Sequence, residues 1–142
     1  EAGLYACARG SRKWRAVSDE KNFTKRPIRA LAMYDSMLYV ATETPSSLLS
    51  YHIGQNTWQE YTLPEIGSSR RVSIAASNKH VWISTNQGAF LLNLTDRLWT
   101  RYHTTEGLIH GGVQAILAGQ NHIWFGTAEG LSRFHWSRAL LE

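Results

Sequence analysis

The chain has 142 residues, a length typical of one domain, and 43% of them are apolar while 18% are charged. This balance can fill a packed core and excludes a disordered chain. The single cysteine, Cys7, excludes an internal disulfide, and no apolar run reaches the roughly 18 residues that cross a bilayer, so we expect no direct membrane insertion. Six Trp, six Tyr and the lack of a long helical period favour strands.

Basic residues give the chain a net charge of +4 and gather at residues 11–15, residues 24–29 and the pair Arg70–Arg71. A basic cluster with interleaved aromatic residues can contact nucleic acid or acidic glycans. Such charges also serve as solvated loop and edge-strand residues, which blunt the pairing of exposed sheet edges. We adopt the second interpretation and expect no nucleic-acid partner.

In chain order, the sequence predicts short strands that gather in four units. Residues 1–18 supply two strands, one after Gly3 and one centred on Trp14. Residues 26–62 supply four strands, which begin at Ile28, Leu38, Ser47 and Thr57. Residues 70–103 supply four more, which begin at Val72, Val81, Gly88 and Leu98. Residues 111–142 supply three, which begin at Val113, Ile123 and Gly130, and at best a degraded fourth, "RALLE".

These units repeat in register. A turn residue stands at the start of the third strand of each unit. These residues are spaced 44, 41 and 42 apart: Gly3, Ser47, Gly88 and Gly130. Eleven residues after each of them stand Trp14, Trp58, Trp99 and Leu141. The second strand of each of the last three units closes on a threonine, and these threonines lie 43 and 42 residues apart: Thr42, Thr85 and Thr127.

Four strands in roughly 42 residues is the period of a β-propeller blade. Small residues in the first strand fit blades that converge on a central channel, and a Trp in the fourth strand can cover the gap between neighbouring blades. A β-sandwich also has short strands and frequent turns, but it does not require a fixed repeat. We therefore predict an all-β fold of β-propeller blades, each of four antiparallel strands, with an incomplete ring in one chain.

The predicted organisation is a single propeller segment of about three and a half blades. It comprises a half blade at residues 1–18, blades at 26–62 and 70–103, and an incomplete blade at 111–142. So few blades cannot readily close an ordinary ring, so we expect a ring-completing partner. That partner is a second copy or the missing blades of a parent protein. In a homodimer, residues 10–18 of one chain would give a fourth strand to residues 111–136 of the other.

The last unit carries a resemblance to a known family. Residues 104–134 resemble the two-component regulator propeller repeat at Gly107, Leu108, Val113, Ile116, Ile123, Trp124, Gly126, Thr127, Gly130, Leu131 and Phe134. The middle unit departs from the pattern at Ser84, which stands where the last unit has Gly126. The unit at residues 26–62 departs further, because its turn at residues 43–47 is two residues longer and contains Pro45.

The resemblance implies the extracytoplasmic sensing part of a bacterial membrane-bound regulator, and hence a periplasmic or extracellular location. It implies ligand sensing and protein contacts without catalysis, so we expect a non-enzymatic binding module with no cofactor. One alternative is a propeller lyase or hydrolase, because "YTLPE" at residues 61–65 is similar to the streptogramin lyase propeller. Another is a purely structural interaction fragment.

The candidate ligand-binding residues are Arg70, His103 and His110, which lie in or beside the connections between predicted blades. Such connections reach the faces of a propeller, where a glycan or small molecule can bind. No histidines stand at metal-ligand spacing, so no metal site and no catalytic residue is predicted. His80 and His122 occupy one slot of the repeat, before the second strand, and are predicted to be exposed turn residues.

The tryptophans divide into two groups. Trp14, Trp58 and Trp99 recur in register, which favours a packing role. Trp136 has no counterpart in the other units and lies beside the missing fourth strand. Trp14 and Trp136 are therefore the candidate partner contacts.

Overall fold

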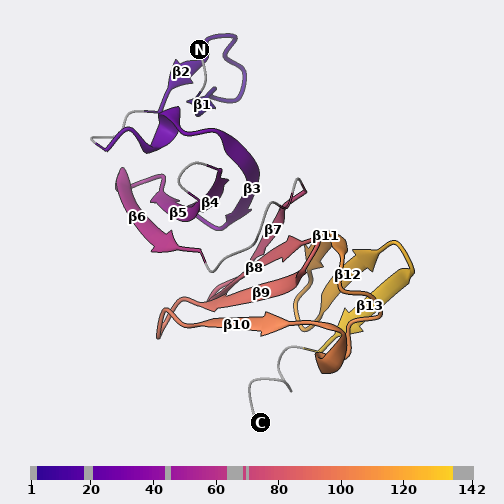
Figure 1. The fold of residues 1–142 in the computed structure, drawn as a ribbon. Helices are drawn as coiled ribbons and strands as arrows, with labels where there is room; N and C mark the ends of the chain where they lie inside the picture. Colours follow the sequence, from indigo (N-terminus) through magenta and orange to yellow (C-terminus); the bar gives the residue numbers. More distant parts are fainter. Residues whose placement is uncertain (1–2, 18–20, 44–45, 64–68, 70, 136–142) are drawn as a thin grey trace.

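The computed structural model describes residues 3–17, 21–43, 46–63, 69 and 71–135. Two antiparallel sheets of four strands dominate the chain (Figure 1). The first contains, in order, β3 (Ile28–Tyr34), β4 (Met37–Thr42), β5 (Ser47–His52) and β6 (Thr57–Thr62). The second contains β7 (Ser73–Ala76), β8 (His80–Thr85), β9 (Gly88–Asn93) and β10 (Trp99–Tyr102).

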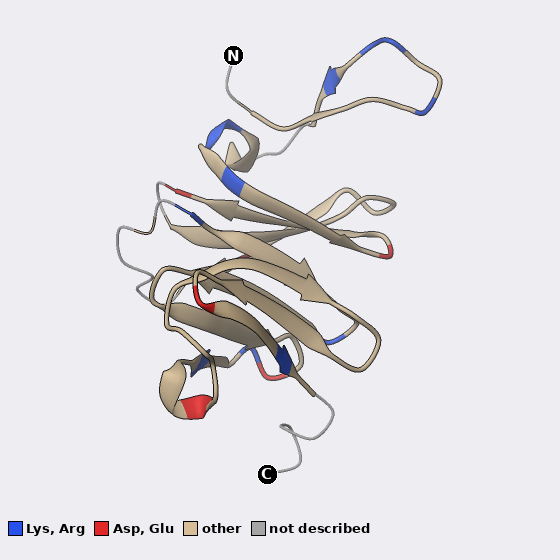
Figure 2. Ribbon diagram, turned by 90° about the vertical axis from the view of Figure 1, so that its right-hand side faces the viewer, with Lys and Arg blue, Asp and Glu red and all other residues tan. Residues whose placement is uncertain are grey.

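Two smaller sheets flank this pair. The third sheet is formed by β11 (Val113–Ala118), β12 (Ile123–Thr127) and β13 (Gly130–Phe134). Near the N-terminus, β1 (Tyr5–Ala6) pairs with β2 (Arg15–Ala16), and the basic loop between them projects from the body of the molecule (Figure 2). The helical elements of the described residues are two short 3₁₀ turns, η1 (Phe23–Lys25) and η2 (Thr104–Glu106).

The sheets are arranged as propeller blades. Their first strands lie against one another, β3 against β7 and β7 against β11, so the sheets diverge from a shared inner edge (Figure 1). No closed ring is formed by the described parts of the chain. The predicted fold class, all-β with blades of four antiparallel strands in an incomplete ring, is confirmed.

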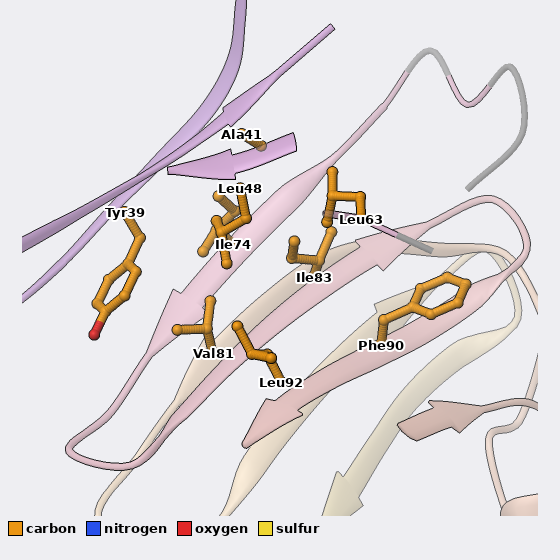
Figure 3. Close-up of a cluster of buried hydrophobic side chains, with 9 residues drawn as sticks. All are labelled: Tyr39, Ala41, Leu48, Leu63, Ile74, Val81, Ile83, Phe90 and Leu92. Atoms are coloured by element: carbon orange, nitrogen blue, oxygen red, sulfur yellow. The ribbon is translucent and has the colours of Figure 1, made fainter. Parts of the chain in front are cut away.

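The main core lies between the first and second sheets. Tyr39, Ala41 and Leu48 of the first sheet face the second across a cluster of aliphatic side chains (Figure 3). Val81 and Ile83 of β8 are fully buried in this cluster. The alternation of a strand places the residue between them on the opposite face.

That opposite face carries Trp82, which packs on the third sheet. Its ring centroid lies 5.4 Å from that of Phe125 in an edge-on arrangement and 5.2 Å from that of Tyr102. Aromatic pairs in these geometries add about 0.5–1.5 kcal/mol to the energy of burial. The second sheet is therefore buried on both faces, and all six residues of β8 are buried.

The recurring threonines close the turn between the second and third strands. The hydroxyl of Thr85 donates to the carbonyl of Gly88 at 3.2 Å and accepts from the backbone N–H of Gln87 at 3.0 Å. Thr127 makes the same two bonds, at 3.0 and 3.2 Å, with Gly130 and Glu129. Because the hydroxyl satisfies both a donor and an acceptor of the turn, threonine is favoured at this position.

The recurring glycine follows from the backbone of the same turn. Gly88 has φ +125°, a conformation that L side chains rarely adopt. A Cβ atom there would lie 2.5 Å from the carbonyl oxygen of Tyr102 on the neighbouring strand β10. The equivalent Gly130 has φ +135°. Gly88 is thus required by both backbone conformation and space, whereas Gly130 is favoured by conformation alone, since a Cβ atom there would meet only Ile109, at 3.5 Å.

Of the outer tryptophans, Trp99 reaches the neighbouring blade, as predicted, whereas Trp58 packs on the η1 turn. The indole N–H of Trp99 on β10 donates to the carbonyl of Thr62, at the end of the first sheet, at 3.0 Å. Trp58 is stacked on Tyr51, with centroids 4.5 Å apart, and lies 5.9 Å from Phe23 of η1. Each of these tryptophans therefore contacts the chain that precedes its own sheet.

We predict that Gly88→Ala destabilises the protein by about 2–3 kcal/mol, because the new methyl group combines a strained φ with a clash against the β10 backbone. Urea unfolding followed by tryptophan fluorescence measures the change. Gly54→Ala is the matched control: its Cβ would meet only the ring of His52, at 3.6 Å, and should change stability by less than about 0.5 kcal/mol. Equal losses in both variants would contradict the role given to Gly88.

Candidate ligand-binding face

One edge of the sheets gathers the connections between blades. In antiparallel strands, the turn after the second strand and the link from the fourth strand to the next blade lie at the same end. Residues 86–87, 103–112 and 128–129 therefore meet there. They enclose a hollow of about 510 Å³, the inner hollow, which is lined by Arg71, Asn86, His110, Gly112, Val113, Gln114 and Ala128. This volume lies within the usual range for small-molecule sites.

The inner hollow has a well-fixed rim. The buried hydroxyl of Ser69 accepts from the backbone N–H of Asn86 at 3.1 Å and donates to the carbonyl of Arg71 at 2.8 Å. Ser69 thereby ties the β8–β9 turn to the residues that enter β7. Across the hollow, the pairing of β11 with β12 slips by one residue between Val113 and Ala115, which makes Gln114 a bulge residue. Bulges commonly redirect a side chain beside a binding site.

His110 is held by the chain that follows it. Its Nδ1 accepts from the backbone N–H of Gly112 at 3.0 Å. A Cβ atom on Gly112 would lie 3.3 Å from the His110 ring, so this glycine lets the ring lie close to the backbone. Because Nδ1 acts as an acceptor, the neutral ring carries its proton on Nε2 and can donate it to a ligand.

His103 lines a different hollow, the outer hollow, which is formed by Arg101, His103, Thr105 and Glu106 and has a volume of about 410 Å³. The backbone N–H of His103 donates to the Glu106 carboxylate at 2.7 Å, which closes the first turn of η2. The hydroxyl of Thr105 and this N–H both hold the pKa of Glu106 below its ordinary value. The carboxylate is therefore ionised and engaged within the turn.

The structure separates the predicted site residues. The rings of His103 and His110 lie beside the adjacent glycines Gly111 and Gly112, yet they line the outer and the inner hollow respectively. Arg70 lies outside the described residues. Its neighbour Arg71, together with Asn86 and Gln114, lines the inner hollow, and none of these three is among the ligand-binding residues predicted from the sequence.

The expectation of exposed turn histidines is wrong for His80. Only 7% of this residue is accessible, and burial, followed by the charge of Lys79, lowers the pKa of its imidazole. His122, in the same slot of the repeat, is half-buried and lies 4.4 Å from the ring of His135. The second sheet has a neighbour on each face, so the same slot is more enclosed there than in the third sheet.

A second surface has an apolar character. The outward face of the third sheet, termed here the open face, presents a hollow of about 360 Å³ lined by Ala115, Ile116, Leu117, Trp124, Gly126 and Leu131. Leu117 and Leu131 are 67% and 63% exposed. The guanidinium of Arg133 lies 5.6 Å from the centre of the Trp124 ring. Trp14 is 68% exposed, and Trp136 lies outside the described residues.

The described residues include neither a metal-binding cluster nor a membrane-spanning helix. Among them, no group of three His, Cys, Asp or Glu side chains is placed to hold a metal ion. No helix in that part of the chain is long and apolar enough to cross a membrane.

Comparisons with known proteins define the fold. No protein-family model matches the chain, and no curated protein matches it. Among solved structures, the extracellular domain of BT4673 from B. thetaiotaomicron, described as a hybrid two-component system, is similar with a TM-score of 0.66 and 21% identity over 96% of this chain. The computationally designed Ika8 protein gives 0.56 and 13% over 76%, and YCF48 bound to D1 peptide gives 0.55 and 16% over 88%.

These likenesses show a propeller-type fold and, at such identities, no closer relationship. The chain spans 18% of the length of the BT4673 domain, 33% of Ika8 and 42% of YCF48. The resemblance of residues 104–134 to the two-component regulator propeller repeat is thus supported at the level of fold.

We predict that acid weakens the fold partly through His80. The folded pKa is lowered, so below about pH 6.5 the unfolded chain takes up a proton that the folded chain resists. Stability should therefore fall as the pH drops through this region and level off below the folded pKa. His80→Met, which places there the residue that Met37 provides in the first sheet, should flatten the curve. Urea unfolding from pH 8 to pH 5 provides the measurement, and parallel curves for both proteins would refute the role of His80.

Proposed function

We propose that the chain is a non-catalytic propeller module that binds a glycan or other small molecule in the inner hollow. The observation that carries this proposal is the hollow itself. Its volume of about 510 Å³ suits a small ligand, its lining mixes polar side chains with backbone, and its rim is fixed by Ser69. Sites of this kind commonly lie on connecting loops held by a rigid scaffold.

We further propose a sensing role outside the cytoplasm, as part of a bacterial two-component-type regulator. Two findings support this role. The last unit resembles the repeat motif of such regulators, and the chain is similar in fold to an extracellular domain described as part of a two-component system. A ligand that bound between two sheets of such a domain would change how they contact each other.

The proposed ligand site is tested with a thermal-shift screen of mono- and disaccharides and small metabolites. At least one compound should raise the melting temperature in a concentration-dependent way. Ala128→Phe should abolish this shift, because Ala128 is an exposed residue on the rim and a phenyl group there would fill the hollow whatever the charge of the ligand.

The matched control is Asn78→Phe, an exposed turn position at the opposite end of the second sheet. It should leave the ligand-induced shift unchanged. A ligand that binds Ala128→Phe as tightly as the unmodified protein would place the site elsewhere and overturn the proposal.

We also propose that a second copy of the chain covers the open face. Trp124 follows Trp82 by 42 residues, the spacing of Thr85 and Thr127, and Trp82 is buried beneath the third sheet. The far face of the first sheet exposes Leu31 and Met33. Each chain therefore has two exposed apolar faces, this one and the open face of the third sheet. Two copies could therefore bury these faces against each other, as the internal sheets already do.

A homodimer is accordingly predicted, and sedimentation equilibrium at micromolar concentration measures its mass. The double variant Leu117→Lys and Leu131→Lys should dissociate it, because both charges would enter the contact. Leu98→Lys is the control, since Leu98 is exposed to a similar extent but lies away from the open face. A monomeric unmodified protein, or a dimer that survives the double variant, would reject this assembly.

A further inference from the structure

We propose that the inner hollow takes the carboxylate of a small anionic ligand, held by Arg71 with the help of Asn86, His110 and Gln114. This inference rests on the proposed function, since it specifies the ligand class of the same hollow. It is carried by the way in which Arg71 departs from the repeat.

The repeat assigns Arg71 to an aliphatic position. The offsets of 43 and 42 residues that relate Thr42, Thr85 and Thr127 also relate Ile28, Arg71 and Val113. Val113 pairs with Thr127 and is only 2% exposed, and Ile28 pairs with Thr42 and packs against a core cluster. In the second sheet the same position carries an exposed arginine that lines the hollow. Packing therefore gives no reason for a cation there.

A second arginine at the inner edge, Arg29, has a structural role. The guanidinium of Arg29 donates to the Glu43 carboxylate at 2.8 Å and to the carbonyl of Ser69 at 2.7 Å. Arg71 has no comparable engagement: among the described residues, no carboxylate forms an ion pair with it, and no Asp or Glu lines the inner hollow. Its positive charge is thus uncompensated on the wall of a concave site.

The other lining groups complement an oxyanion. Asn86 and Gln114 carry amide N–H donors, and His110 offers Nε2–H while its Nδ1 accepts from Gly112. A guanidinium presents two parallel N–H groups that match the two oxygens of a carboxylate, and such charge-assisted pairs are about twice as strong as neutral ones. The donors come from both the second and the third sheet.

The test uses the smallest matched pair of probes, acetate and acetamide, which differ in charge but hardly in shape. Each is titrated at constant ionic strength into the ¹⁵N-labelled protein, and the backbone amide shifts of Asn86, Gly112 and Gln114 are followed. Acetate should give saturable shifts with a dissociation constant of about 1–50 mM, as expected for so small a ligand. Acetamide should bind at least about tenfold more weakly.

Arg71→Val is the decisive variant. It restores the aliphatic residue type of the two sister blades, so it should fold, and it should weaken acetate binding at least about tenfold. Arg71→Gln provides a polar replacement with the same expected loss. Lys79→Gln, at the opposite end of the second sheet, removes the same charge from the protein and should leave acetate binding unchanged.

Two results would overturn the inference: equal shifts with acetate and acetamide, or acetate binding that persists in both Arg71 variants. Failure of the inference remains distinct from failure of the proposed function. A neutral ligand that is blocked by Ala128→Phe but not by Arg71→Val would keep the hollow as the binding site and remove only the carboxylate. If no compound of the screen raises the melting temperature of either the unmodified protein or Ala128→Phe, the proposed function is wrong.

Discussion

The architecture depends on the burial of the second sheet on both of its faces. Val81 and Ile83 meet the first sheet, and Trp82 between them meets the third. Each such side chain contributes roughly 1.5–3 kcal/mol when it leaves water, so a single blade, open on both faces, would lose most of this energy. The neighbouring sheets therefore stabilise one another, and the second sheet contributes buried side chains to the cores on both of its faces.

Equivalent positions consequently have different surroundings. Trp82 is enclosed by aromatic rings, whereas Trp124, one repeat later, faces outward and has a guanidinium over its ring. Such a cation–π contact is worth about 0.5–1 kcal/mol at an exposed site, less than the burial of an indole. The tryptophan of this repeat position thus lies in a packed contact between sheets in the second sheet and on an exposed face in the third.

The sequence predicted the features that the repeat imposes locally. Thr85 and Thr127 recur because a hydroxyl closes the turn, and Gly88 and Gly130 recur because the turn needs positive φ. These are properties of a few adjacent residues, and a periodic pattern displays them. The strand order within each sheet followed for the same reason.

The features that depend on neighbouring sheets were harder to predict. The repeat slot of His80 looks like an exposed turn, and only the position of that sheet between two others buries it. His103 and His110 are close in sequence, but η2 directs them to separate hollows. Gln114 enters the inner hollow at a bulge that periodicity does not reveal. One signal was present in the sequence: Arg71 stands where its sister units carry aliphatic residues.

The inner hollow has walls from two different sheets. Asn86 belongs to the turn of the second sheet, while His110 and Gln114 belong to the entry into the third. Beyond the hollow, these two sheets are joined by the ring contacts of Trp82 with Phe125 and Phe134. A ligand held from both walls would add a second link between two sheets that these ring contacts already join. Binding would then restrict movement between two blades without the movement of any loop.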